Sequence, residues 1–339
     1  MGFPEQAGRQ TVAALSEGEI LDRILKFLPV GPHTDLGPGD DAAIVAAPGA
    51  RFTVTTDILV EGSHFRREWS TGAEVGARAA AQNLADIAAM GATPTSLVVS
   101  MVLPPDLPVS WLEDFAGGLG AEAFEAGAGV VGGDIVAGPV LTVSVAAHGY
   151  LGGRPVTRSG AKPGDTVAVA GTLGLSAAGL AALQSGAVSP ALRGNEIPFA
   201  FRKAVETFRS PKPPLKAGPL AAGLGATAML DLSDGLVMDA GRLAKASGVR
   251  VDLSRYGLSG AKANLEDAGR ALGVDPMQWV LYGGEDHGLL ATFPPYVLVP
   301  EPFRAAGTVG SFDVGAGEDS GSRVTLDGAP LTGGFDHFG

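Results

Sequence analysis

The chain of 339 residues contains no cysteine. This absence excludes disulfides, thiolate nucleophiles, and zinc or iron–sulfur sites with cysteine ligands. Charged residues are also sparse, at 18% of the chain, while hydrophobic residues make up 45%. That composition is typical of a globular protein and excludes a disordered one. At this length we expect one large domain or two ordinary ones, each with its own core.

Positive charge is scarce, because 24 Lys and Arg residues stand against 36 Asp and Glu, which gives a net charge of −12. A net acidic chain argues against broad binding to nucleic acid or to an anionic membrane. Long hydrophobic runs are scarce too: the longest uncharged segment, 166–192, is interrupted by glycines and by Pro190. We interpret it as a strand, a turn and a helix, not as a membrane span. The first ten residues contain no apolar signal sequence, so we expect a cytoplasmic protein.

Several common catalytic motifs are absent or misplaced. Residues 127–132 fit the G-x-G-x-x-G pattern, but a predicted helix precedes them and strands follow. A Rossmann dinucleotide site requires the reverse order. The chain has no P-loop, no G-x-S-x-G nucleophile elbow, and no pair of histidines at zinc-binding spacing. We therefore exclude a P-loop enzyme, a serine hydrolase of that type and a histidine-ligated zinc enzyme.

Hydrophobic periodicity predicts an α+β protein in which helices and strands alternate. In the first part we expect helices at 17–29, 72–90 and 109–126, and strands at 42–47, 52–58, 95–103, 128–136 and 139–150. A basic stretch rich in turn residues follows at 152–165, and we place the boundary between domains 1–151 and 152–339 at its start. In the second part we expect strands at 166–170, 227–231, 249–253, 286–293, 306–312 and 322–327, and helices at 174–184, 198–209, 215–223, 235–247 and 261–272.

Carboxylates recur beside Gly, Ser or Thr, most of them at the ends of apolar runs. They are Asp40, Asp41, Asp57, Asp86, Asp134, Asp231, Asp234, Glu285 and Asp286. Singly, such an Asp is most often a turn residue or a helix cap. Asp86 fits neither role, because it lies within an alanine-rich helix whose apolar face makes an uncompensated carboxylate costly. Taken together, the carboxylates are explained most simply by convergence on metal ions, and all-oxygen ligand sets favour Mg²⁺.

The residues around these carboxylates add detail. Thr55-Thr56-Asp57 offers hydroxyl, carbonyl and carboxylate oxygens, all hard ligands. Ser233 precedes a predicted helix and can cap it, which leaves the first N–H groups of the helix facing the same site. His64 follows the Thr-Thr-Asp cluster, where it either contacts a substrate phosphate or lies in a surface turn.

An ordered set of motifs spanning nearly the whole chain resembles the thiamine-monophosphate kinase family. The motifs are GDDAA at 39–43, TTDILVEGSHF at 55–65, NLADIAAMGA at 83–92, GGD at 132–134, TRSGAKPGD at 157–165, DLSDG at 231–235, GGED at 283–286 and FDHF at 335–338. The resemblance implies a two-domain α+β chain with the aminoimidazole ribonucleotide synthetase-like fold, in which helices flank mixed sheets. It also implies a homodimer that forms through the N-terminal domain.

The resemblance implies ATP-dependent phosphorylation of thiamine monophosphate to thiamine diphosphate with several Mg²⁺ ions. The implied metal ligands are Asp41, Thr55, Thr56, Asp57, Asp86, Asp134 and Asp231, with Asp234 as a further one. The implied ATP-binding residues are Gly133, Asp134, Arg158 and Ser233. The implied substrate contacts are His64, Glu285 and Phe335. Two positions depart from the family: His287 stands where an aromatic residue, often Tyr, usually follows GGED, and Phe335 where Tyr or Trp is common.

The implied reaction needs no general base. The accepting phosphate has a second pKa of about 6, so its oxygen is already anionic at neutral pH. The obstacle is charge repulsion, since two unit charges about 4 Å apart repel by roughly 4 kcal/mol at an effective dielectric constant near 20. Metal ions offset that repulsion, and Arg158 adds a phosphate donor, so we expect direct in-line transfer.

Alternatives stay open at this point. Aminoimidazole ribonucleotide synthetase shares the implied fold and is the main enzymatic alternative. Selenophosphate synthetase and the hydrogenase-maturation protein HypE share it too, but each normally depends on a cysteine or selenocysteine, which this chain lacks. A non-catalytic nucleotide sensor on the same scaffold is a third possibility, and the full carboxylate set argues against it.

Overall fold

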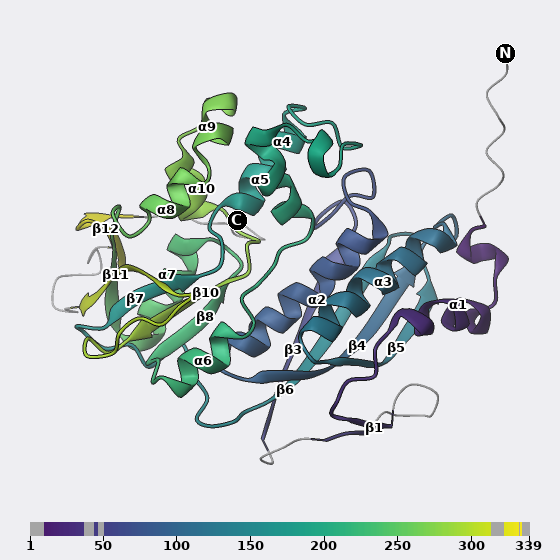
Figure 1. Ribbon diagram of the computed structural model, residues 1–339, viewed down its shortest axis with the longest axis horizontal. Coiled ribbons are helices and arrows are strands. Elements are labelled where there is room, and N and C mark those ends of the chain that lie inside the picture. Colours follow the sequence, from purple (N-terminus) through teal and green to yellow (C-terminus); the bar gives the residue numbers. More distant parts are fainter. Residues whose placement is uncertain (1–9, 37–43, 47–50, 313–321, 332, 334–339) are drawn as a thin grey trace. The chain divides into compact units, whose positions relative to one another are not determined.

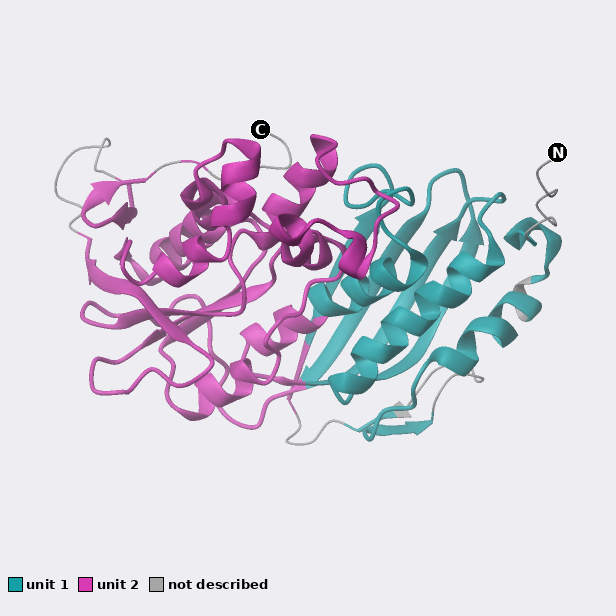
Figure 2. Cartoon of the chain, turned by 45° about the horizontal axis from the view of Figure 1, so that its top comes forward, with its two compact units in different colours: residues 1–47, 54–83, 94–149 teal, residues 48–53, 84–93, 150–339 magenta. Residues whose placement is uncertain are grey.

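The computed structural model describes residues 10–36, 44–46, 51–312, 322–331 and 333 (Figure 1). The chain forms two compact units (Figure 2). Unit 1 comprises residues 1–47, 54–83 and 94–149, and unit 2 comprises residues 48–53, 84–93 and 150–339. Each unit contains helices packed with a β-sheet, as expected of an α+β protein. In the part of the chain that is described, no helix has both the length and the apolar character needed to cross a membrane.

Unit 1 is built on a four-stranded sheet with the strand order β3-β6-β4-β5. The strands are β3 (Phe52–Val60), β4 (Thr93–Leu103), β5 (Gly129–Ala137) and β6 (Thr142–Tyr150). The helices α2 (Gly72–Ala89) and α3 (Val109–Glu125) cover one face of the sheet (Figure 2). Strands β4 and β5 are parallel, and α3 makes the crossover between them.

Helices α2 and α3 approach so closely that main-chain atoms set their separation. A Cβ atom at Gly76 would lie 2.1 Å from the carbonyl oxygen of Phe115, and one at Gly118 would lie 2.0 Å from that of Ala73. Real Cβ atoms do not come so near, so only glycine fits at these positions. The close approach explains why α2 reads as a run of Ala and Gly with few large side chains.

Smaller elements precede this sheet. They are the 3-10 turn η1 (Val12–Ala14), α1 (Glu17–Ile24), the 3-10 turn η2 (Leu25–Phe27), β1 (Thr34–Leu36) and β2 (Ile44–Val45). Ser16 and Glu19 form a capping box that starts α1. The single helix predicted at 17–29 is therefore wrong in its second half, where α1 gives way to η2 and an extended segment. Strand β1 was not predicted. Of the strand predicted at 42–47, Ile44–Val45 form β2, while residues 42, 43 and 47 lie outside the described residues.

Unit 2 is built on a seven-stranded sheet with the strand order β13-β12-β9-β11-β7-β10-β8. Its strands are β7 (Thr166–Ala170), β8 (Ala228–Leu232), β9 (Val249–Leu253), β10 (Gly288–Phe293), β11 (Arg304–Ser311), β12 (Val324–Leu326) and β13 (Ala329–Pro330). All neighbours are antiparallel except β12 and β9. Strands β8, β10 and β12 are buried along their whole length, and residues of β7, β8 and β10 belong to a buried apolar cluster of unit 2.

The helices of unit 2 match the predicted ones with three differences. They are α4 (Leu175–Gln184), the 3-10 turn η4 (Gly194–Glu196), α5 (Phe199–Arg209), α6 (Ala217–Gly223), α7 (Leu236–Ser247), α8 (Ser259–Ala263), α9 (Glu266–Leu272) and α10 (Pro276–Tyr282). The predicted helix at 261–272 is two short helices. Neither η4 nor α10 was predicted, although Asp275 caps α10 ahead of a proline at its first position, a recognisable start signal. The predicted Asp327-Gly328 turn is confirmed, and it joins β12 to β13.

Candidate functional site

Two of the predicted motifs meet in unit 2. Strand β8 ends in the DLSDG motif, and β10 begins directly after GGED. The two strands are antiparallel neighbours, with Asp231 opposite Leu289. The main-chain N–H of Glu285 donates to the Ser233 carbonyl at 2.8 Å, and that of His287 donates to the Leu232 carbonyl at 3.0 Å. The GGED turn is thus held against the start of α7 by main-chain bonds on both sides of Asp286.

The GGED turn has an unusual backbone. Glu285 has φ = 67° and His287 has φ = 52°, both in the left-handed region that non-glycine residues rarely occupy. Such residues cost on the order of 1–3 kcal/mol each, and they persist where the surroundings over-determine them, often at functional sites. The side chain of Glu285 is 42% exposed. The turn therefore presents the predicted substrate contact on a constrained main chain.

Asp286 anchors the same turn from the other side. Its carboxylate accepts hydrogen bonds of 2.7 Å from the hydroxyl of Thr172 and 2.7 Å from the main-chain N–H of Gly174. Only 3% of Asp286 is exposed. Burial raises the pKa of this carboxyl to about 6, while the hydrogen bonds from Thr172 and Gly174 oppose the rise. Asp286 was noted in the sequence as a carboxylate, but its partners lie more than a hundred residues earlier and could not be inferred.

His287 lies between two carboxylates. Its Nδ1 is 3.8 Å from Oδ2 of Asp231, and its Nε2 is 3.8 Å from Oε2 of Glu285. The ring is buried, and neither nitrogen has a hydrogen-bond partner among the described residues. Burial lowers the pKa of His287, but Asp231 and Glu285 outweigh it and raise that pKa to about 10. The imidazolium thus faces a predicted metal ligand on one side and a predicted substrate contact on the other.

Asp234 is already engaged by a cation. Arg242 forms an ion pair with Asp234 and a second one, of 2.8 Å, with the buried Asp239. Asp239 also accepts a hydrogen bond of 3.0 Å from the main-chain N–H of Asp234. Burial raises the pKa of Asp239 to about 7. Asp239 and Arg242 were not predicted as site residues, although their i, i+3 spacing on α7 is a signal visible in the sequence.

The expectation that Ser233 caps α7 is wrong. The N-cap of this helix is Gly235, with φ = 100°, and no side chain bonds there. A side chain at Gly235 would meet the main chain of Tyr282, at 2.8 Å from its carbonyl oxygen, so the helix starts where only glycine fits. Ser233 contributes its carbonyl to the GGED turn instead.

In unit 1, the Thr-Thr-Asp cluster lies on β3, the edge strand of its sheet. Thr55 and Asp57 are half-buried on one face of the strand, and Thr56 is exposed on the other. The main-chain N–H of Asp57 donates to Oδ1 of Asn83 at 3.0 Å. Asn83 is fully buried on α2, and Asp86, half-buried, follows three residues later on the part of that helix that belongs to unit 2.

The structure also shows where the remaining predicted site residues lie and what they contact. His64 accepts a hydrogen bond of 3.1 Å from the Val60 N–H through Nδ1, so part of its role is to close a turn. Gly133 and Asp134 lie on β5, opposite Val99 and Ser100 of β4, and Asp134 is exposed. A Cβ at Gly133 would come within 2.0 Å of the Val99 carbonyl oxygen, so only glycine fits there.

Arg158 is exposed, and its carbonyl accepts a hydrogen bond of 2.7 Å from the hydroxyl of Ser247 at the end of α7. The predicted residues Asp41 and Phe335 lie outside the described residues. Within the described ranges, no three His, Asp or Glu side chains gather closely enough to hold a metal ion. Unit 2 therefore brings together Asp231, Ser233 and Glu285, while the complete metal-ligand set stays a prediction.

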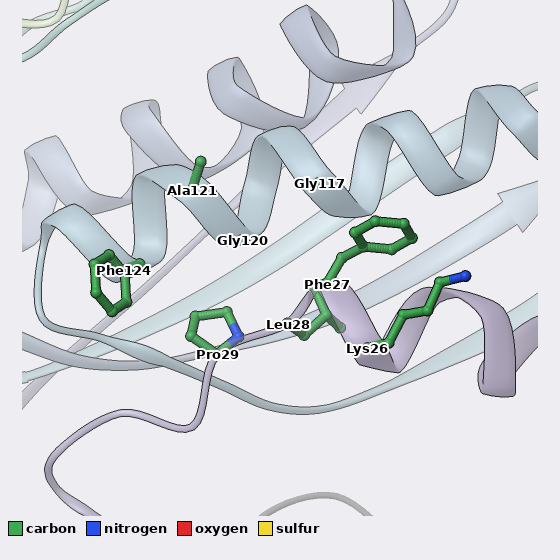
Figure 3. Close-up of a pocket in the computed structure, with 8 residues that line it drawn as sticks. All are labelled: Lys26, Phe27, Leu28, Pro29, Gly117, Gly120, Ala121 and Phe124. Atoms are coloured by element: carbon green, nitrogen blue, oxygen red, sulfur yellow. The ribbon is translucent and has the colours of Figure 1, made fainter.

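A separate hollow lies in unit 1, between η2 and α3 (Figure 3). It has a volume of about 330 Å³, and its lining is mainly apolar. The lining residues are Lys26, Phe27, Leu28, Pro29, Gly117, Gly120, Ala121 and Phe124. None of them is a predicted site residue, so this hollow is distinct from the candidate site.

The chain is similar to known proteins over almost its full length. The N-terminal domain of AIR synthase related proteins matches residues 39–151, and the C-terminal domain of the same group matches residues 162–290. A thiamine-monophosphate kinase of Mycobacterium tuberculosis (strain ATCC 25618 / H37Rv) is 43% identical over 332 residues, which cover 97% of this chain and 93% of that protein. The chain belongs to the thiamine-monophosphate kinase family. It is therefore an enzyme, and a kinase.

Solved structures agree with this family. A thiamine-monophosphate kinase from Stenotrophomonas maltophilia K279a has a TM-score of 0.75 at 29% identity and covers 93% of this chain and 96% of its own. AaThiL complexed with AMPPCP and TMP has a TM-score of 0.75 at 30% identity, with coverages of 97% and 99%. The hydrogenase maturation protein HypE, at 19% identity and a TM-score of 0.65, shares the fold alone. The predicted two-domain fold of the aminoimidazole ribonucleotide synthetase type is confirmed.

Proposed function

We propose that this kinase transfers the terminal phosphoryl group of ATP to thiamine monophosphate and produces thiamine diphosphate. Relatives from Mycobacterium tuberculosis that carry the name of that activity are 43% identical to this chain over 93% of their own length. A solved structure shows AaThiL, 30% identical, complexed with AMPPCP and TMP, and AMPPCP is an ATP analogue that stands in for the phosphoryl donor. The observation that carries the proposal is the constrained GGED turn, which presents Glu285 beside His287 and Asp231.

The chain's own residues then bind and orient the two reactants. Glu285, His64 and Phe335 contact thiamine monophosphate, and Arg158, Gly133, Asp134 and Ser233 hold ATP. The accepting phosphate oxygen is already anionic, because its second pKa is about 6, so no side chain has to remove a proton. Transfer is direct and in line, without a phosphorylated enzyme.

The oxygen donors of this chain fit Mg²⁺. Thr55 and Asp57 lie on the same face of β3, and Asp231 is a buried carboxylate that already has a cationic neighbour, His287, at 3.8 Å. Hard oxygen ligands of this kind suit Mg²⁺ rather than softer metals. The residues that hold it are Asp41, Thr55, Thr56, Asp57, Asp86, Asp134, Asp231 and Asp234. When bound, Mg²⁺ supplies the positive charge that offsets repulsion between the phosphates.

We also propose that the chain forms a homodimer through the uncovered face of the unit 1 sheet. On β3 the apolar residues Val54 and Ile58 are 62% and 52% exposed, and Val136 on β5 is 51% exposed. An exposed apolar face on a sheet marks an interaction surface. The self-association fits the family resemblance, and it would cover these side chains.

An assay of the purified protein tests the activity. The protein is incubated with ATP, Mg²⁺ and either thiamine monophosphate or free thiamine, and the products are separated by chromatography. We expect thiamine diphosphate from the monophosphate alone, and none once EDTA is added. Absence of product despite ATP binding would refute the proposed activity and favour a nucleotide sensor, whereas turnover of a formylglycinamidine substrate would identify an aminoimidazole ribonucleotide synthetase.

A second assay tests the direct transfer. After incubation with ATP labelled in the terminal phosphate, the denatured protein should carry no label. A labelled protein whose label passes on to thiamine monophosphate would show a two-step mechanism instead.

A further inference from the structure

The side chain of Asp286 faces away from the part of the turn that contacts substrate in the proposed function. Its described partners are the Thr172 hydroxyl and the Gly174 N–H, each at 2.7 Å, and the main chain of Ser176 adds a third bond. All three belong to residues 172–176, which lead into α4 and include the start of that helix. The one buried carboxylate of the GGED turn thus forms its hydrogen bonds with a segment of unit 2 that is distant in the sequence.

That segment is itself immobilised by packing. Gly174 has φ = 76°, and a Cβ there would lie 2.5 Å from the main-chain carbon of Trp279 on α10. Helix α10 ends one residue before Gly283, where a Cβ would lie 2.8 Å from Cβ of Ala177 on α4. The start of α4 therefore packs against α10, and α10 leads directly into the GGED turn. The Asp286 side chain links that turn back to the start of α4.

Three attachments fix the turn around Glu285. Two are the main-chain bonds of Glu285 to Ser233 and of His287 to Leu232. The third is the Asp286 carboxylate. Left-handed backbone at two non-glycine residues persists only where the surroundings impose it. With the third attachment gone, the turn can relax toward an ordinary conformation and move the Glu285 side chain.

We propose that Asp286, held by Thr172, is a positioning residue that fixes Glu285 in the conformation from which it contacts thiamine monophosphate. The proposal rests on the proposed function, in which Glu285 is a substrate contact. It assigns Asp286 and Thr172 no contact with either reactant. It also predicts an asymmetric effect. Removing the hydrogen bond between Thr172 and Asp286 should weaken binding of thiamine monophosphate and leave ATP binding unchanged.

The sharpest variant is Thr172→Val, which removes one hydroxyl donor to Asp286 and keeps the shape of the side chain. Thr172→Ser restores the hydroxyl. Thr325→Val is the matched control, because the Thr325 hydroxyl donates to Asp252 at 2.6 Å, also in unit 2 and between strands far from the turn. Loss of either hydroxyl bond should lower stability by a similar amount.

We expect Thr172→Val to raise KM for thiamine monophosphate about tenfold, the equivalent of one lost hydrogen bond, with KM for ATP unchanged. Thr172→Ser should behave as wild type, and Thr325→Val should alter neither KM. An unchanged KM for thiamine monophosphate in Thr172→Val, or an equal rise in both KM values, would refute the positioning role. If Thr172→Val does not fold, the two KM values of Asp286→Asn are compared with those of wild type in the same way.

Hydrogen exchange gives a readout that does not depend on turnover. The amides of Glu285 and His287 should exchange about tenfold faster in Thr172→Val than in wild type, and at the wild-type rate in Thr325→Val. If wild type fails to phosphorylate thiamine monophosphate while exchange is still faster in Thr172→Val, the Thr172–Asp286 bond does hold the turn and the proposed function is wrong. If wild type is active and exchange in Thr172→Val is unchanged, that bond does not hold the turn and the proposed function stands.

Discussion

The side-chain oxygen of Asn83 on α2 accepts a hydrogen bond of 3.0 Å from the main-chain N–H of Asp57 on β3. Strand β3 lies at the edge of its sheet, and this bond ties it to helix α2. The amide nitrogen of Asn83 donates in turn to the Ala79 carbonyl at 2.9 Å. A fully buried side chain therefore fixes the register between the strand that carries Asp57 and the helix that covers it.

Replacing this amide should destabilise unit 1. Asn83→Leu removes the side-chain hydrogen bonds to the Asp57 N–H and the Ala79 carbonyl, and the loss of such bonds at a buried place costs about 1–3 kcal/mol. We expect a fall of that order in the free energy of unfolding, measured by urea denaturation, together with a lower kcat. The control is Asn195→Leu at an exposed amide, which should change stability by less than about 0.5 kcal/mol. Equal stability of the two variants would contradict the assigned role.

Asp57 should be essential for turnover. Asp57→Asn keeps the main-chain bond to Asn83 and the size of the side chain but removes the negative charge. If Asp57 is a Mg²⁺ ligand, kcat should fall by roughly 10²–10³-fold or more at saturating Mg²⁺, with little change in the melting temperature. Asp35→Asn, at an exposed aspartate on β1, is the matched control and should retain full activity. A near wild-type rate for Asp57→Asn would show that the metal assignment is wrong.

Asp286 should give the folded protein a measurable pH dependence. Its pKa in the folded state is about 6, above the ordinary value of 3.8, because burial penalises the ionised form. The folded state therefore binds this proton more tightly than the unfolded state, and the associated stability is present below about pH 4 and lost as pH rises through about 6. At about 1.4 kcal/mol for each pH unit, the loss is on the order of 3 kcal/mol.

Urea unfolding of wild type and Asp286→Asn across this range measures that loss. The free energy of unfolding of wild type should fall relative to that of the variant between pH 4 and pH 6, and the difference should level off above pH 7. Parallel curves for the two proteins over the whole range would show that Asp286 has an ordinary pKa.

The uncovered sheet face should be required for self-association. Ile58→Lys places a charge among the exposed apolar residues of β3, and burying that charge in an interface is costly. We expect a dimer for wild type and a folded monomer for the variant in analytical ultracentrifugation. Phe124→Lys is the control, because Phe124 is 74% exposed on α3, which covers the opposite face of the sheet. A dimer that survives Ile58→Lys, or that Phe124→Lys disrupts, would place the interface elsewhere.

Local signals in the sequence were enough to predict most of the elements. Apolar runs and alternating apolar residues located the strands β4, β6, β7 and β9 to within a few residues, and the Asp327-Gly328 pair located the last turn. The wrong predictions concern elements too short to show a periodic pattern and an element whose end the local sequence does not mark. Helix α10 has only seven residues, too few for a periodic pattern, and the helix predicted from 17 to 29 breaks after Ile24.

The site was predictable as a list of residues and not as an arrangement. Asp231 and Glu285 were named from their motifs, yet only the pairing of β8 with β10 places His287 between them. Similarly, the bond between Thr172 and Asp286 joins positions 114 residues apart. Contacts of that sequence separation follow from sheet topology, which a single sequence does not specify.

The glycine contacts between α2 and α3 bear on how unit 1 folds. Glycine lowers helix stability by about 1 kcal/mol relative to alanine, and α2 and α3 both contain glycines at their mutual contact. The glycines offset part of the helix propensity that the alanines supply, so docking adds to the stability of both helices. At the crossing the glycines lose no side-chain entropy. The two helices and the sheet beneath them should therefore become structured in a single cooperative step.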